Sequence, residues 1–399
     1  MMRIVLIYIL TLISVPLCTS AASAHEHGDD TLAALERVLS GSLAGESEAV
    51  KNGLRLKYRV MHARPGDIIT LDPGVYTLKV PSTYNVDRFF HYEGDVIDLK
   101  VNQDLTLRGG DPDPSKTIID WAGSPYAEKL AKGLIVSREA KHQKSFPANI
   151  TLAVENLTFR NAVGYSNNGA ALRPQGTKLL VRNCRFINNQ NGILYTSVVE
   201  QVPLSPHYHA GELIVENSLF ERNGESIGEL AHAIYFSRGD RLSVRNSRFV
   251  NTKNNGHHIK SLARETLVTG SFFSNADEEI TYIIDTPNGG DVTVQDNIIE
   301  YYPATDGEDN RNMFTYASMQ TQNNKTPGPL GAFHFRENTV TIYHPRASSI
   351  VTDDQSQKAI TACGNELRAG DGVKISRLLR QFAQGQACRN AALSEQQTY

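Results

Sequence analysis

The chain has 399 residues and a formal net charge of −3 at pH 7. This charge excludes a surface that is basic throughout, as a general nucleic-acid binder would need, although it allows a local basic groove. The length suits one long solenoid or two ordinary domains.

The first 24 residues have the parts of a secretory signal peptide. Arg3 is followed by an apolar run over residues 4–17, and Ala22 and Ala24 give a small-residue cleavage site before His25. The run is too short to span a membrane comfortably, and no later segment is apolar enough. We therefore predict an exported monomer, periplasmic or extracellular.

Residues 25–60 predict an N-terminal cap and a first strand. Leu32, Leu35 and Leu39 follow helical spacing, which predicts a short helix that closes one end of a solenoid core. Apolar residues alternate over residues 54–60, which predicts a strand.

A short sequence motif then recurs, in which apolar and polar residues alternate around an asparagine. Clear copies span residues 152–159, 179–186, 213–220 and 242–249, and looser copies span residues 267–273, 294–299 and 335–340. The asparagine slot holds Asn156, Asn183, Asn217, Asn246, Asn297 and Asn338, with Gly270 in one loose copy. Successive slots lie 24 to 41 residues apart. Repeats of this length with period-2 patterning indicate stacked strands, one coil per copy.

We therefore expect an all-β fold, a parallel β-helix over residues 61–345 with short helical caps at its ends. The slot asparagines would lie at a corner, where each amide can bond to backbone or to the asparagine of the next coil. The small residue that follows would form an inward column, made of Thr158, Cys184, Ser218, Ser247 and Ser271. Residues 346–399 would be a tail whose apolar residues from Ile375 to Phe382 form a capping helix.

Three cysteines follow the predicted signal peptide. Cys184 falls in the small-residue column, which predicts a buried free thiol. Cys363 and Cys388 lie 25 residues apart, so in an oxidising compartment they either form a disulfide or remain two thiols.

The candidate site comes from aligning three neighbouring segments by their distance to the next repeat. This alignment stacks Ile234, Ile259 and Ile283 inward, and it places Tyr235 beside Lys260 on the outer face, about 5 Å apart. It also turns His258 outward beside Lys260, and puts Tyr282 on the next coil. The remaining candidates, placed at this face and its turns, are His232, Arg238, Arg264, Asp285 and Asn288.

Cations and aromatic rings on one face suit an acidic sugar polymer. Aromatic rings stack on sugars, and Lys or Arg pairs with uronate carboxylates. The same groups could perform β-elimination, with Lys260, His258, Tyr235 or Tyr282 moving the protons. The alternative is that Lys260 is an ordinary solvated charge and His257 a core histidine.

The repeats over residues 61–345 resemble the right-handed parallel β-helix proteins of the pectate-lyase-like superfamily. Within them, residues 259–261 (Ile-Lys-Ser) look like the Asn-Lys-Ser motif of chondroitinase B and the alginate lyases, with Ile259 in place of the asparagine. The resemblance implies a polysaccharide lyase with Lys260 as the base. It also implies an arginine acid on the next coil, where this alignment has Tyr282 or Ile284.

Other activities share this fold. A glycoside hydrolase would need two carboxylates across a bond, a C5-epimerase shares the proton abstraction, and a non-catalytic binding or assembly protein needs only the cleft. Many relatives use calcium, and the acidic run over residues 277–279 is the nearest candidate for it, although neighbouring strand residues point to opposite faces.

Overall fold

The structure is a computed structural model. It describes residues 32–79, 98–121, 133–138, 150–164, 169–175, 177–196, 211–224, 231–237, 239–302, 312–318, 331–344, 347, 349–353 and 360–375. The predicted signal peptide and Cys388 lie outside these residues.

The chain divides into two compact units, residues 1–44 and 45–399. In the first, residues 32–40 are helical, as the leucine spacing predicts, and Leu35 and Leu39 are buried. The capping role of this helix stays a prediction.

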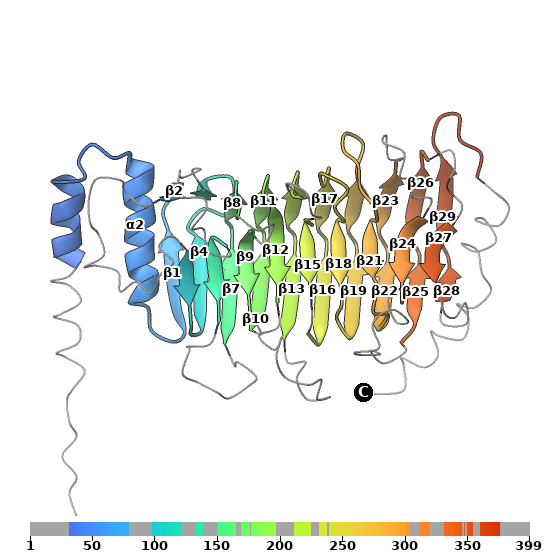
Figure 1. Ribbon diagram of the computed structural model, residues 1–399, viewed down its shortest axis with the longest axis horizontal. Coiled ribbons are helices and arrows are strands. Elements are labelled where there is room, and N and C mark those ends of the chain that lie inside the picture. Colours follow the sequence, from blue (N-terminus) through green and yellow to red (C-terminus); the bar gives the residue numbers. More distant parts are fainter. Residues whose placement is uncertain are drawn as a thin grey trace, which may run out of the picture. The chain divides into compact units, whose positions relative to one another are not determined.

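The second unit is a stack of coils, each contributing one strand to each of three parallel sheets (Figure 1). The described strands of sheet A are β1 (Asp67–Leu71), β4 (Leu105–Gly109), β7 (Thr151–Glu155), β10 (Lys178–Arg182), β13 (Glu212–Glu216), β16 (Arg241–Arg245), β19 (Glu265–Thr269), β22 (Asp291–Gln295), β25 (Phe333–Arg336) and β28 (Ile360–Cys363).

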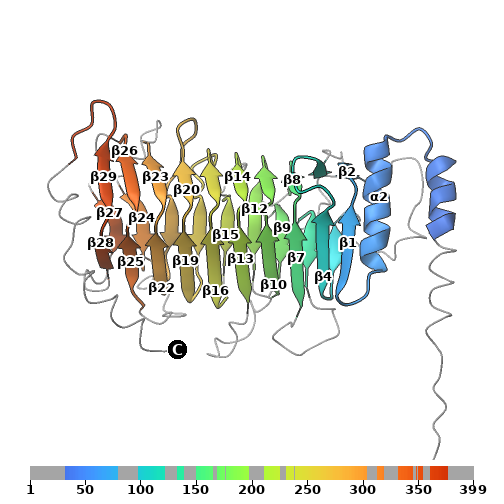
Figure 2. The same ribbon diagram turned by 180° about the vertical axis from the view of Figure 1, so that it is seen from behind.

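Sheet B follows sheet A in each coil. Its described strands are β2 (Gly74–Leu78), β5 (Thr117–Trp121), β8 (Thr158–Arg160), β11 (Arg185–Ile187), β14 (Leu219–Glu221), β17 (Arg248–Val250), β20 (Phe272–Ser274), β23 (Ile298–Tyr301), β26 (Thr339–Ile342) and β29 (Glu366–Ala369). Figure 2 shows the same stack from behind.

Sheet C completes each coil and carries the candidate site. Its described strands are β3 (Leu99–Val101), β6 (Ile135–Ser137), β9 (Ala170–Pro174), β12 (Asn191–Tyr195), β15 (Ile234–Phe236), β18 (Ile259–Ser261), β21 (Ile284–Thr286), β24 (Asn312–Tyr316) and β27 (Ser349–Asp353). The predicted parallel β-helix is confirmed. Strands β27, β28 and β29 extend the β-helix beyond residue 345, so the predicted start of the tail at residue 346 is too early.

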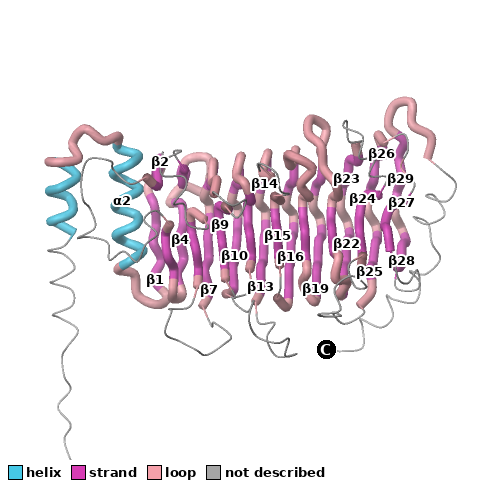
Figure 3. The backbone as a smooth tube through the Cα atoms, in the orientation of Figure 1, coloured by secondary structure: helices cyan, strands magenta, loops and turns pink. Residues whose placement is uncertain are grey.

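The predicted strand over residues 54–60 is wrong, because these residues belong to helix α2 (Glu48–Met61). The Ser47 side chain caps its first turn by accepting a hydrogen bond from the Val50 N–H. Buried residues Val50, Leu54 and Val60 follow helical as well as alternating spacing, and the helical stripe prevails. Figure 3 shows this helix in cyan beside the magenta strands.

Helix α2 packs closely on the first coil. Leu56 and Val60 join the core of the β-helix. A Cβ atom at Gly53 would lie 2.0 Å from the Thr77 carbonyl oxygen, so only glycine allows this approach. The helix therefore supplies a cap that shields the first coil from water.

The interior is built from columns of like residues. Five phenylalanines of sheet B stack face to face, with ring centroids 4.6 to 5.3 Å apart: Phe159, Phe186, Phe220, Phe249 and Phe273. All five are fully buried. In-register pairing places each ring on the next, because parallel strands lie about 4.8 Å apart.

The corner between sheets A and B holds two ladders. Asn156, Asn183, Asn217 and Asn246 have positive φ, and Asn183 donates to the Asn156 side chain at 2.8 Å, as predicted. In later coils Gly270, Asp296 and Glu337 take this position. Asn297 and Asn338 therefore lie one residue further on, which corrects the predicted alignment.

The second ladder uses the next position inward. Cys184, Ser218, Ser247 and Ser271 continue there into Asn297 and Asn338, each backbone N–H donating to the side-chain oxygen of the next coil. Thr158 is not part of this column, because it pairs with Arg185 in sheet B. Cys184 is a buried free thiol, as predicted, and burial raises its pKa to about 12. Cys363 is disulfide-bonded.

Among the described residues, we find no helix with the length and apolarity needed to cross a bilayer.

We expect Phe220→Ala to lower the free energy of unfolding by about 3–5 kcal/mol, because it opens a cavity between two stacked rings. Phe272→Ala, on the outer face of the same sheet, is the matched control and should cost clearly less. Denaturant unfolding followed by circular dichroism measures both. Equal losses would contradict the central role of the stack.

Candidate functional site on sheet C

Three adjacent strands of sheet C build the site. β15, β18 and β21 pair in register, so Tyr235 lies beside Lys260 and Lys260 beside Asp285. Asp285 in turn lies beside Thr315 of β24. Because side chains alternate along a strand, these four form one column that points away from the core.

The centre of the column is the carboxylate of Asp285. One oxygen, Oδ2, lies 3.3 Å from Lys260 Nζ and 3.3 Å from His257 Nε2. The other, Oδ1, accepts a hydrogen bond from the hydroxyl of Thr315. Burial acts to raise the pKa of Asp285, but the His257 hydrogen bond, the Lys260 charge and the Thr315 hydroxyl together lower it. Asp285 is therefore a carboxylate that its hydrogen-bond and ion-pair partners keep ionised.

Lys260 is the accessible member of this charged cluster. Its side chain is 18% exposed, whereas the side chains of His257 and Asp285 are 3% and 6% exposed. Its Nζ atom lies 5.8 Å from the centre of the Tyr235 ring. The two residues that flank Lys260 have structural roles, since Ile259 is in the core and Ser261 bonds to Thr266 at the corner.

Two stacked histidines support the column from one side. The rings of His232 and His257 lie 4.6 Å apart, and His232 Nδ1 accepts a hydrogen bond from the backbone N–H of His257 at 3.0 Å. Burial lowers the pKa of both, so both are neutral near pH 7. His257 then donates from Nε2 to Asp285, while its buried Nδ1 has no hydrogen-bond partner among the described residues.

The outward orientation predicted for His258 is wrong. His258 is fully buried, 5.9 Å from the ring of Phe273, and its Nδ1 hydrogen-bonds the Thr252 hydroxyl. The strand begins only at Ile259, so alternation counted back from Lys260 fails at the preceding turn. His257 occupies the outer position instead, beside His232.

The structure brings four predicted residues together and leaves others apart. Tyr235, Lys260, Asp285 and His232 meet, and the Tyr282 ring lies 5.3 Å from that of His257.

The three other candidates lie elsewhere. Arg264 is exposed and pairs with Asp240 at 3.3 Å, at the turn that leads to sheet A. Asn288 lies in the turn between β21 and β22. Arg238 is outside the described residues.

Asp285 itself was predicted at a turn, yet it lies within β21. The cause is a one-residue slip: Ile259 pairs with Ile284, whereas the sequence alignment chose Ile283. The same slip hid Thr315, which lies beside Asp285, whereas His257 was expected only as a core histidine because the turn before Ile259 was not foreseen. Ile234 lies eight residues before the inward Leu242, and counting eight residues back from the equivalent Val292 selects Ile284, which reveals the Lys260–Asp285 pair.

In the residues that the structure describes, no three His, Cys, Asp or Glu side chains converge in a way that could hold a metal ion. Within the acidic run, Asp277 accepts a hydrogen bond from Asn251, and Glu278 pairs with Arg222 at 2.6 Å.

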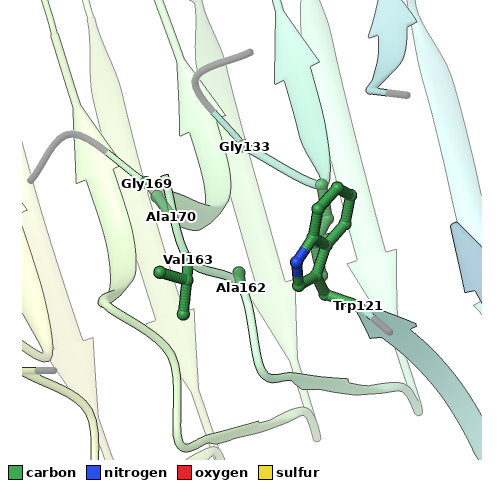
Figure 4. A pocket seen from close by; sticks show the side chains of 7 residues that line it. Trp121, Gly133, Ala162, Val163, Gly169 and Ala170 are labelled. Carbon is green, nitrogen blue, oxygen red and sulfur yellow. The ribbon is translucent and has the colours of Figure 1, made fainter. Parts of the chain in front are cut away.

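A small pocket lies nearer the N-terminal coils, lined by Trp121, Ala162 and Ala170 (Figure 4). Its volume of about 10 Å³ leaves room for roughly one water molecule. It is therefore too small to hold a sugar.

Comparison with known proteins supports the fold. Residues 131–273 match the family model described as a right handed beta helix region. The chain is a right-handed parallel β-helix. The match agrees with the right-handed β-helix that the resemblance implied. A search of curated proteins found no match.

Three solved structures resemble this β-helix weakly, each at 12% identity. A mannuronic acid specific polysaccharide family 6 lyase from human gut microbiota has a TM-score of 0.35, with 86% of this chain and 91% of that chain covered. DFA-IIIase from Arthrobacter chlorophenolicus A6 has a TM-score of 0.36, with coverages of 87% and 85%. For the PL6 family alginate lyase AlyGC the TM-score is 0.33, and the match covers 84% of this chain but only 56% of AlyGC. With TM-scores this low, none of the three supports an inference about this chain.

The buried histidines predict a stability that falls on acidification. His232, His257 and His258 have lowered pKa values in the folded protein, that of His258 falling to about 3, whereas an unfolded histidine titrates near 6.5. Below pH 6.5 the unfolded chain binds protons that the folded protein excludes. His258 should therefore cost about 1.4 kcal/mol of unfolding free energy per pH unit between pH 6.5 and its folded pKa, and His232 and His257 should act in the same direction.

Denaturant midpoints measured between pH 7 and pH 5 check this expectation. His258→Gln should reduce the pH dependence of the unfolding free energy by the equivalent of one proton. Substitution of the half-buried His334 should change this pH dependence less. An unchanged slope in His258→Gln would show that His258 does not resist protonation.

Proposed function

We propose that this chain is an exported carbohydrate-active protein that cleaves an anionic, uronate-containing polysaccharide by β-elimination. The observation that carries the proposal is the position of Lys260. Its amino group is partly exposed on the outer face of sheet C, between the Tyr235 ring and the buried Asp285 carboxylate. The Lys-Ser resemblance supports the same residue.

The geometry suits the chemistry of this reaction. Lys260 can pair with the uronate carboxylate, and this pairing acidifies the hydrogen on the adjacent carbon. When that C–H bond breaks, its electron pair forms the double bond and the C–O bond to the next sugar breaks. Lys260 and Tyr235 are the two groups placed to take the carbon-bound proton and to return one to the leaving oxygen.

The cluster supports a glycoside hydrolase less well. A hydrolase needs two carboxyl groups, one of them an acid with a raised pKa. Asp285 is fully hydrogen-bonded and its pKa is lowered, the opposite of what an acid catalyst needs. A C5-epimerase would use the same proton abstraction as a lyase, and NMR of the recovered polymer separates the two.

A non-catalytic polysaccharide-binding role is the second candidate. It is favoured by the near-complete burial of His257 and Asp285, whose hydrogen bonds tie them to each other and to Lys260. Such a cluster can hold a cationic surface in place without taking part in chemistry.

We expect the mature protein to produce unsaturated uronate, seen as ultraviolet absorbance, from at least one of alginate, pectate, glucuronan, chondroitin or bacterial exopolysaccharides. Assays with and without calcium test the metal requirement. Lys260→Ala should lower the rate of unsaturated uronate formation by about 100-fold or more, because a proton-transfer group is removed.

Lys178→Ala is the matched control, since Lys178 also pairs with a carboxylate of the next coil, but on sheet A. Equal activity of the two variants would exclude a special role for Lys260. No absorbance on any polymer would exclude the lyase among these substrates, and binding measurements would then test the second candidate.

Tyr235→Phe keeps the ring but removes the hydroxyl. If Tyr235 moves a proton, kcat should fall by about 100-fold while KM changes little. If KM rises and kcat is unchanged, Tyr235 only supports the sugar.

A further inference from the structure

We propose that Asp285 is a positioning residue, which fixes the amino group of Lys260 between two coils and does not itself contact the polysaccharide. The inference deepens the proposed function, and only its kinetic test rests on that function.

The first support is the burial and bonding of Asp285. Only 6% of its side chain is exposed, and each of its oxygens already accepts a hydrogen bond or ion pair from His257, Lys260 or Thr315. A carboxylate so enclosed has little left to offer a sugar. Its partners also act together to lower its pKa, so that the anion persists beside Lys260.

The second support is that the contacts come from three coils. His257 and Lys260 lie on one coil, Asp285 on the next and Thr315 on the one beyond. The carboxylate is therefore held from both sides along the stack, and Lys260 is held through it. On the opposite side Lys260 meets Tyr235, and the stacked His232 and His257 are neutral.

The third support is the residue type at this position. In the lyases whose Lys-Ser motif this chain resembles, the resemblance implies an arginine on the coil after the lysine. Here that position holds an anion 3.3 Å from the amino group. A lysine paired in this way has its amino group held in place by the carboxylate of the next coil.

The test that does not depend on activity is the rate at which an amine-reactive reagent acylates each lysine, followed by mass spectrometry. Only the unprotonated amine reacts. Asp285→Asn should speed acylation of Lys260 severalfold, because the amino group is released from a buried carboxylate that holds it at 3.3 Å. The acylation rate of Lys178 in the same sample should not change. In Asp285→Glu the acylation rate of Lys260 should stay as low as in the wild type.

Glu212→Gln is the matched control. It removes the partner of Lys178, 2.7 Å away on sheet A, so it should affect Lys178 and leave Lys260 unchanged. If Asp285→Asn does not fold by circular dichroism, Thr315→Val replaces it, since it removes only a hydroxyl that holds the carboxylate. An unchanged Lys260 rate in whichever variant folds would overturn the proposal.

The kinetic test uses the polymer that gives absorbance with the wild type. Asp285→Asn should lower kcat, Asp285→Glu should restore part of it, and neither should reduce activity further in a Lys260→Ala background. A further loss in that background would mean that Asp285 acts on the substrate directly. Absence of lyase activity in the wild type would remove the proposed function, and the acylation rates would still decide the role of Asp285.

Discussion

The in-register stacking of parallel strands is the constraint on which the rest of this structure depends. Hydrogen bonds between coils set a spacing of about 4.8 Å, and every position must then tolerate its own equivalent above and below. Phenylalanine satisfies this inside sheet B by ring stacking, and serine or asparagine satisfies it at the corner by passing one hydrogen bond to the next coil. The core is therefore a set of columns.

The same constraint creates the candidate site. A polar column on the outer face of sheet C would repel itself if its members were alike. Tyr235, Lys260, Asp285 and Thr315 instead alternate in chemistry, so that each contacts a complementary neighbour. The ion pair between Lys260 and Asp285 is sheltered by burial, which strengthens it relative to an exposed pair but also makes its loss more costly. Neutral His257 completes the cluster without adding charge.

Much of the fold could be predicted from the sequence, because alternation and the recurring asparagine report directly on strand pairing and corner geometry. What failed was register at single-residue precision. Leu267 is apolar but outward, and the inward position beside it is held by Thr266, so apolarity alone misaligned that coil. On the next coil, the choice of Ile283 over Ile284 hid the contact between Lys260 and Asp285, and the turn before Ile259 reversed the orientations expected for His257 and His258.

The prediction for residues 54–60, which form part of helix α2, was wrong for a different reason. The buried apolar residues of this helix alternate from Leu54 to Val60, but Gly53 and Lys57 are buried as well, and this wider set fits only helical spacing. The strands beyond residue 345 were missed because their copies are more polar, although Asn365 continues the asparagine ladder. These features depend on tertiary contacts that no short window of sequence contains.

The coil-to-coil origin of the Lys260–Asp285 contact has an evolutionary consequence. The distance between the two side chains is set by strand pairing and not by the 24 residues that separate them. Corner loops can therefore lengthen, shorten or change composition while the pair keeps its geometry. Such an architecture separates the part of a site that must stay constant from the part that can diversify.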